Sequence, residues 1–149
     1  MNERDSVART VHLVKLCVGA EKVEDLTDWQ ASRRRLWPDG LPRHITRMWP
    51  RREAELLNEG SLYWVFKGLI LARQRVLRLE KILGEDGISR CGLVLDPEVF
   101  RTEPVPRRPF QGWRYLVQDD APRDLAANRQ NEDSLPPGLS AALAEIGVR

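Results

Sequence analysis

Arginine and aromatic side chains alternate in two short segments, a combination suited to holding a nucleic acid. Residues 46–52 read TRMWPRR and residues 107–115 read RRPFQGWRY. Guanidinium groups bind phosphates bidentately, and exposed rings stack on unpaired bases, which contributes ~1–3 kcal/mol per base. The competing interpretation places the rings in the core and the arginines on the solvent side. The candidate contacts are Arg47, Trp49, Arg51, Arg52, Arg107, Arg108, Trp113 and Arg114.

Arg73 and Arg75 extend this set if residues 69–83 form a strand. On a strand the two side chains would share one face, whereas on a helix they would point in different directions. Apolar residues at positions 69, 72, 76, 79 and 83 have helical spacing. The Asp86-Gly87 turn and the strand-like residues 91–95 instead favour a hairpin, so both interpretations remain open.

Enzymatic chemistry has one candidate residue, Lys67. It follows the apolar run 61–66, where desolvation would lower the pKa of its ammonium group and make it a general base. A surface lysine is the alternative. His12, Cys17, His44 and Cys91 lack the short spacing of zinc ligands, and no nucleophile or phosphate-loop motif is present. We therefore expect no metal and no cofactor.

Charge is distributed unevenly along the 149 residues, although the net charge is only +2. Residues 33–114 carry seventeen basic and ten acidic side chains, while both ends of the chain are acidic. Of the 24 basic residues, 20 are arginine. This bias suits phosphate recognition, but a GC-rich genome would produce it as well.

The elements that must position these groups alternate between short strands and turns. We expect strands at 12–18, 44–49, 61–67, 91–95 and 111–117, and short helices near 25–35 and 51–58. The apolar run 61–67 is apolar on both faces, as in a central strand. The pattern predicts an α+β domain whose mostly antiparallel sheet curls into a small barrel.

Residues 1–118 are expected to form this single domain, and residues 119–149 an acidic linker that ends in a short helix at 139–148. No stretch approaches the ~20 apolar residues of a membrane span, and the N-terminus is a poor signal peptide. Two widely spaced cysteines favour reduced thiols. These features predict a cytoplasmic protein, and they leave its oligomeric state open.

The phrases HLVKLCVG (12–19), TRMWPRR (46–52), GSLYWVFKG (60–68) and PFQGWRYL (109–116) resemble an uncharacterised bacterial domain family that is typical of alphaproteobacteria. The resemblance covers residues 10–125 and implies no activity. At fold level, the passage from Pro104-Val-Pro106 to Gln111-Gly-Trp113 is similar to the closing strands of PUA-like β-barrels, including ASCH domains. Such barrels typically bind RNA or modified nucleobases, and some ASCH members are amidohydrolases. The ASCH phrase Gly-x-Lys-x-x-Thr-x-Arg is not intact, since only parts around Thr46 match.

Three functions follow as hypotheses. The first is a non-catalytic nucleic-acid-binding module, with RNA or another polyanion as partner and the arginines and tryptophans above as contacts. The second is a small enzyme acting on a nucleoside-like substrate with Lys67 as base. The third is a protein-interaction module whose acidic tail folds back over its basic body.

Overall fold

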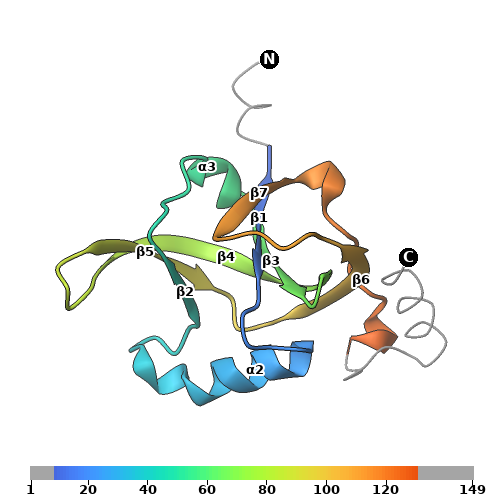
Figure 1. The fold of residues 1–149 in the computed structure, drawn as a ribbon, viewed down its shortest axis with the longest axis horizontal. Helices are drawn as coiled ribbons and strands as arrows, with labels where there is room; N and C mark the ends of the chain where they lie inside the picture. Colours follow the sequence, from blue (N-terminus) through green and yellow to red (C-terminus); the bar gives the residue numbers. More distant parts are fainter. Residues whose placement is uncertain (1–8, 131–149) are drawn as a thin grey trace.

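A computed structural model describes residues 9–130, which form one mixed sheet with two short α-helices (Figure 1). The elements in chain order are β1 (Val11–Leu16), α2 (Val23–Ser32), the 3₁₀ helix η1 (Arg34–Leu36), β2 (Arg43–Thr46), α3 (Glu53–Leu56), β3 (Ser61–Phe66), β4 (Leu69–Leu83), β5 (Ser89–Leu95), β6 (Phe100–Pro106), β7 (Trp113–Val117), and the 3₁₀ helices η2 (Gln118–Asp120) and η3 (Ala127–Arg129).

The sheet is organised around β4, which is 15 residues long. The strands follow the order β2-β5-β4-β3-β1-β7, and β6 also pairs with β4. The first half of β4 pairs with both β3 and β6, and its second half pairs with β5. In residues 9–130 the pair β1 and β3 is parallel, while the other five pairings are antiparallel. The expected predominance of antiparallel pairing is therefore present, with one parallel exception.

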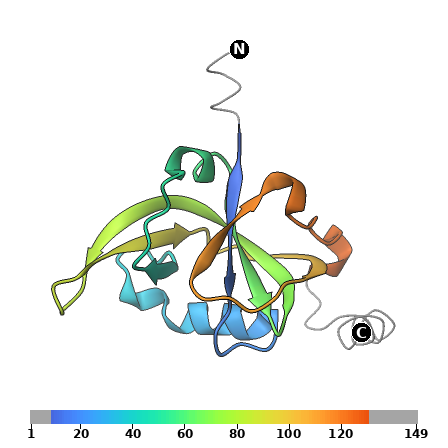
Figure 2. The same cartoon turned by 45° about the horizontal axis from the view of Figure 1, so that its top comes forward.

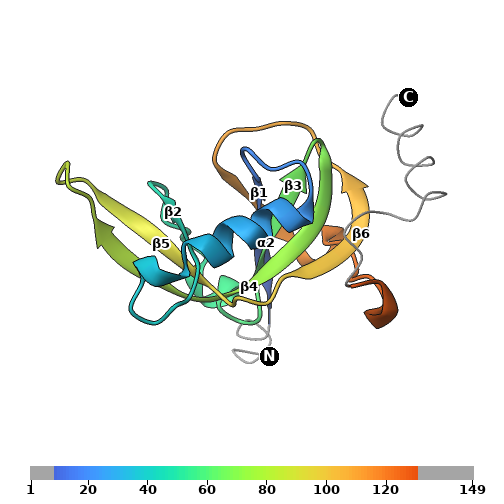
Figure 3. The same cartoon turned by 90° about the horizontal axis from the view of Figure 1, so that it is seen from below.

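One face of the sheet carries the main core. Side chains from β1, β3, β4, β5 and β7 meet there, and Leu13, Leu62 and Phe66 are almost fully buried. Helix α2 lies across this side of the strands (Figure 3) and contributes Val23 and Leu26. Helix α3 contributes Leu56. Apolar burial of this kind supplies most of the stabilisation of a domain of this size.

The opposite face carries a smaller apolar cluster and a polar region. Val14, Tyr63, Val65, Ile70 and Leu116 form the cluster. In Figure 2, α3 and the segment that follows β7 flank the start of β1. Residues 123–125 bond along β6, because Glu103 N–H donates to the carbonyl of Arg123 and Leu125 N–H to that of Arg101, each at 2.8 Å.

The expected closure into a barrel is not confirmed. The hydrogen-bonded path ends at β2 and β7, and across residues 9–130 no strand pairing joins these two ends. Side chains bridge the gap instead. The indole N–H of Trp113 donates to the carbonyl of Met48 at 2.9 Å, and the hydroxyl of Tyr115 accepts from the N–H of Arg52 at 3.0 Å. We call this gap between β2 and β7 the seam.

The ambiguous residues 69–83 form strand β4, so their helical periodicity was misleading and the hairpin interpretation was correct. Strand β6 was not expected, because Pro104 and Pro106 indicate the end of an element. The remaining expected strands and both helices are present, with boundaries shifted by a few residues.

The described part of the expected tail, residues 119–130, contacts the sheet. Leu125 is buried, and the Gln130 side chain bonds to the backbone N–H and carbonyl of Arg101. The expected helix at 139–148 lies outside the described residues. Within residues 9–130, no helix is long and apolar enough to span a lipid bilayer.

Candidate nucleic-acid interface

The two arginine-bearing segments lie side by side at the seam. The hydrogen bond from Trp113 to the Met48 carbonyl joins them, and the Cα of Gly112 faces the Met48 side chain, since a methyl group placed there would lie 3.8 Å from Met48 Cε. Segments that are about 60 positions apart in sequence are therefore in contact at Met48 and residues 112–113, and their backbones approach each other in Figure 1.

The two candidate tryptophans have different roles. Trp113 is 5% exposed and packs in the main core with its ring edge against Tyr115, so its ring is not available for stacking. Trp49 is 40% exposed, and its indole N–H donates to the Glu53 carboxylate at 3.2 Å. Only Trp49 of this pair presents ring surface to solvent.

The candidate arginines divide according to whether a carboxylate already holds them. Arg52 pairs with Glu55, and Arg73 pairs bidentately with Asp124, all at 2.8–2.9 Å. Among the residues described, no ion pair involves the others, which are Arg47, Arg51, Arg75, Arg107, Arg108 and Arg114.

Phe110 lies between two of these unpaired arginines. The guanidinium carbons of Arg107 and Arg114 each lie 5.4 Å from the centre of its ring. Arg114 also donates to the Gln111 carbonyl at 2.8 Å. Cation–π contacts at this distance hold a guanidinium in place without neutralising it. We define the seam surface as Arg47, Trp49, Arg51, Arg107, Arg108, Phe110 and Arg114.

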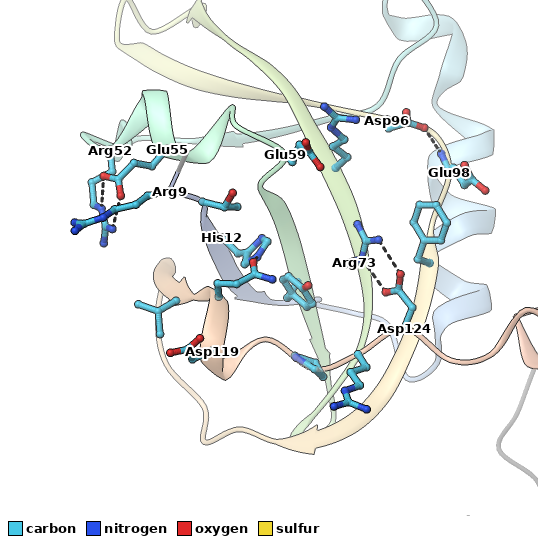
Figure 4. Close-up of a pocket in the computed structure, with 18 residues that line it drawn as sticks. Arg9, His12, Arg52, Glu55, Glu59, Arg73, Asp96, Glu98, Asp119 and Asp124 are labelled. Atoms are coloured by element: carbon cyan, nitrogen blue, oxygen red, sulfur yellow. Dashed lines mark hydrogen bonds and ion pairs between the residues drawn. The ribbon is translucent and has the colours of Figure 1, made fainter. Parts of the chain in front are cut away.

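Arg73 and Arg75 lie elsewhere, in an open groove of about 1010 Å³ on the polar part of the second face (Figure 4). Arg73 stacks over Phe100 at 4.6 Å and donates to the buried Ser61 hydroxyl at 2.9 Å. Six carboxylates and five arginines line this groove, so its charges nearly cancel. That balance makes it a poor site for a polyanion.

His12 sits at the base of this groove with both ring nitrogens occupied. Its Nδ1 accepts the N–H of Ser61 at 3.0 Å, and its Nε2 bonds to the Gln118 side-chain oxygen. Burial lowers the pKa of His12, so the ring is neutral at neutral pH. With neither nitrogen free, His12 acts here as a structural connector.

A second, smaller pocket of about 350 Å³ adjoins the seam. It lies between the end of β1, helix α2, β2 and β3, and Trp29, Trp64, His44 and Lys15 line it. Lys15 is the register partner of Trp113 in the β1–β7 pair, and His44 precedes Arg47 by three residues. Sequence reasoning did not assign these four residues to a site, because they come from four separate elements and form no motif.

Lys67 occupies the tight turn between β3 and β4, where its φ is +48°. Its side chain is 65% exposed and its ammonium group lies 3.3 Å from the Glu21 carboxylate. The desolvation on which the general-base hypothesis depended is absent at this position. Residues 9–130 contain no cluster of three or more potential metal ligands among His, Cys, Asp and Glu.

Comparison with known proteins identifies a family without assigning an activity. A family model described as "Protein of unknown function (DUF1489)" matches residues 13–149. No curated protein and no solved structure gave a match. The match covers most of the chain, and the chain therefore belongs to this family.

Proposed function

We propose that this member of the DUF1489 family is a non-catalytic module that binds single-stranded RNA through the seam surface. The observation that carries the proposal is the bond between Trp113 and Met48, which brings together two arginine-rich segments. Apart from Arg52, which pairs with Glu55, their arginines have no carboxylate partner among residues 9–130. Unneutralised guanidinium groups beside an exposed ring supply both elements of single-strand binding, namely phosphate contacts and base stacking.

Charge distribution supports the choice of this surface over the larger groove. The groove contains acidic side chains in about the same number as arginines, and two of its arginines are already paired. A polyanion gains more from the seam surface, where each new phosphate contact releases a counterion and replaces no existing ion pair.

The proposal extends to the fold and the setting of the protein. We infer that the curled sheet is a variant of the PUA-like barrels in which side chains, rather than strand pairing, cover the seam. We also infer that the protein is cytoplasmic, where RNA is available to it. An experimental structure superposed on PUA-like domains would test the relationship.

Salt dependence tests the proposed function directly. Affinity for a labelled single-stranded oligoribonucleotide of mixed sequence, measured by fluorescence anisotropy, should fall steeply between about 50 and 200 mM salt. Arg47→Gln and Arg107→Gln should each weaken binding and reduce the slope of log K against log salt by about 0.7.

Lys81→Gln is the matched control, because it removes one positive charge from an exposed position of β4 that is not part of the seam surface. It should leave the slope unchanged. Absent binding, or equal effects of Lys81→Gln and Arg47→Gln, would contradict the proposal, since either result removes the link between affinity and the seam surface.

A further inference from the structure

The smaller pocket beside the seam has the form of a site for a flat ring. Two indoles line it, Trp64 from β3 and Trp29 from α2, and its volume is about 350 Å³. Trp64 is 6% exposed, whereas Trp29 is 51% exposed and stands at the rim. Small-ligand sites are typically concave, mostly apolar and equipped with a few convergent polar groups, and this pocket has all three properties.

Both indoles are held in place before any ligand arrives. The N–H of Trp64 donates to the Gln74 side-chain oxygen at 3.0 Å, and Gln74 exchanges two 2.8 Å hydrogen bonds with Gln30 of α2. The guanidinium of Arg33 stacks on Trp29 at 4.8 Å, and Arg33 lines the neighbouring groove rather than this pocket. The other surface of Trp29 is thus available to the pocket, and little ordering is needed for binding.

The polar groups of the pocket favour a neutral ligand with donors and acceptors along its edge. Burial, with a smaller effect of Lys15, lowers the pKa of His44 to about 4, so its imidazole is uncharged at neutral pH. Lys15 contributes a positive charge and Asp25 a negative one. Opposite charges and a neutral imidazole suit the edge of a heterocycle better than a phosphate group.

We propose that this pocket binds one unstacked nucleobase between Trp29 and Trp64. The inference rests on the proposed function when the base belongs to RNA, because Lys15 and His44 connect the pocket to the two arginine-bearing segments of the seam surface. A free nucleoside presents the same base to the pocket. The experiment below therefore distinguishes a base within RNA from a free nucleoside.

The test compares a short single-stranded oligoribonucleotide with an abasic oligomer of the same length and charge. The protein should bind the base-containing oligomer more tightly. Trp29→Ala should lower that affinity about 5- to 160-fold and leave the abasic affinity unchanged, as expected when one base loses its stacking partner. Trp29→Phe should restore most of the difference. Ile88→Ala, which removes an exposed apolar side chain from the β4–β5 hairpin, is the control and should have no effect.

Free adenosine, guanosine, cytidine and uridine form the second arm, with tryptophan fluorescence as the readout. Nucleoside binding that Trp29→Ala abolishes, in a protein that fails to bind RNA, would support the pocket and overturn the proposed function. Equal affinity for intact and abasic oligomers, together with no response to any nucleoside, would overturn the pocket while leaving salt-dependent RNA binding intact.

Discussion

At the scale of single residues, His44 places a buried and uncharged imidazole in the wall of the smaller pocket. Its Nε2 is buried and, within the residues described, has no hydrogen-bond partner. The ring lies edge-on against Trp64, with centroids 5.7 Å apart. A proton added to this ring would place a charge among apolar groups and near Lys15, which explains the depressed pKa.

This geometry predicts that acid destabilises the protein. The folded-state pKa of His44 is lowered to about 4, below the ordinary value of 6.5, so the stabilisation is complete above pH 6.5 and is lost as the pH falls toward 4. The free energy of unfolding should decrease by about 2 kcal/mol between pH 7 and pH 5 on account of this residue. Urea unfolding at both pH values measures the change.

His44→Leu removes the titrating group, and the remaining pH dependence should then be smaller and due mainly to His12, whose pKa is also lowered by burial. An identical loss of stability in the wild type and in His44→Leu would mean that His44 is protonated as easily in the folded chain as in the unfolded one.

Gly60 lies where α3, β1 and β4 meet, and the backbone around it leaves no room for a side chain. Its N–H donates to the Leu56 carbonyl at 2.8 Å, and its own carbonyl accepts from Val76 at 3.0 Å. A β-carbon on residue 60 would overlap the carbonyl oxygens of Leu56 and Val11. The positive φ at this helix end belongs to Glu59, at +66°, so Gly60 is required for close backbone packing and not for its dihedral angles.

At the scale of elements, α3 and β1 can approach each other only if residue 60 has no side chain. Gly60→Ala should therefore cost about 3 kcal/mol or more, as in an overpacked core. Gly19→Ala is the comparison, because Gly19 has a φ of +85° but open space around it. It should cost only about 1 kcal/mol of backbone strain. The denaturation midpoints of the two variants measure these two costs. A smaller loss of stability for Gly60→Ala than for Gly19→Ala would show that packing at residue 60 is loose.

Strand β4 shows why periodicity alone was an unreliable guide. Its apolar residues are spaced as in a helix because the strand changes neighbours along its length, with irregular register at 70–72 and 76–78. Burial alternates regularly from Ile70 to Val76, and the irregularity at 76–78 then shifts the alternation of inward and outward side chains. The turn at Asp86-Gly87 was the better predictor, since Gly87 has a φ of +80° that the turn requires.

At the scale of the whole molecule, the sequence predicted most strands and the class of the fold, but not the positions of the arginines relative to one another. The proximity of the Arg47 and Arg107 segments depends on the seam, which no local pattern encodes. The pairing of Arg73 with Asp124 likewise joins positions 51 residues apart. The hypothesis of an acidic tail that competes with partners stays a prediction, with this ion pair as its nearest described contact.

The Arg73–Asp124 pair also holds residues 119–130 against the sheet. Asp124→Asn should weaken this attachment and cost about 1–3 kcal/mol, because the partly buried guanidinium loses a charged acceptor. Hydrogen exchange should quicken at Leu125 and along β6. Asp119→Asn removes the same charge from an exposed position and should change neither quantity. Equal exchange rates in the two variants would mean that other contacts hold residues 119–130 against the sheet without this ion pair.

The placement of β1 between β3 and β7 has a consequence for synthesis of the chain. Its partner β7 begins about 100 residues later, so a nascent polypeptide leaves one edge of its first strand bare until almost the entire domain has emerged from the ribosome. Ribosome-bound intermediates that end before residue 113 should accordingly be targets for chaperones, and release from them should coincide with the appearance of the last strand.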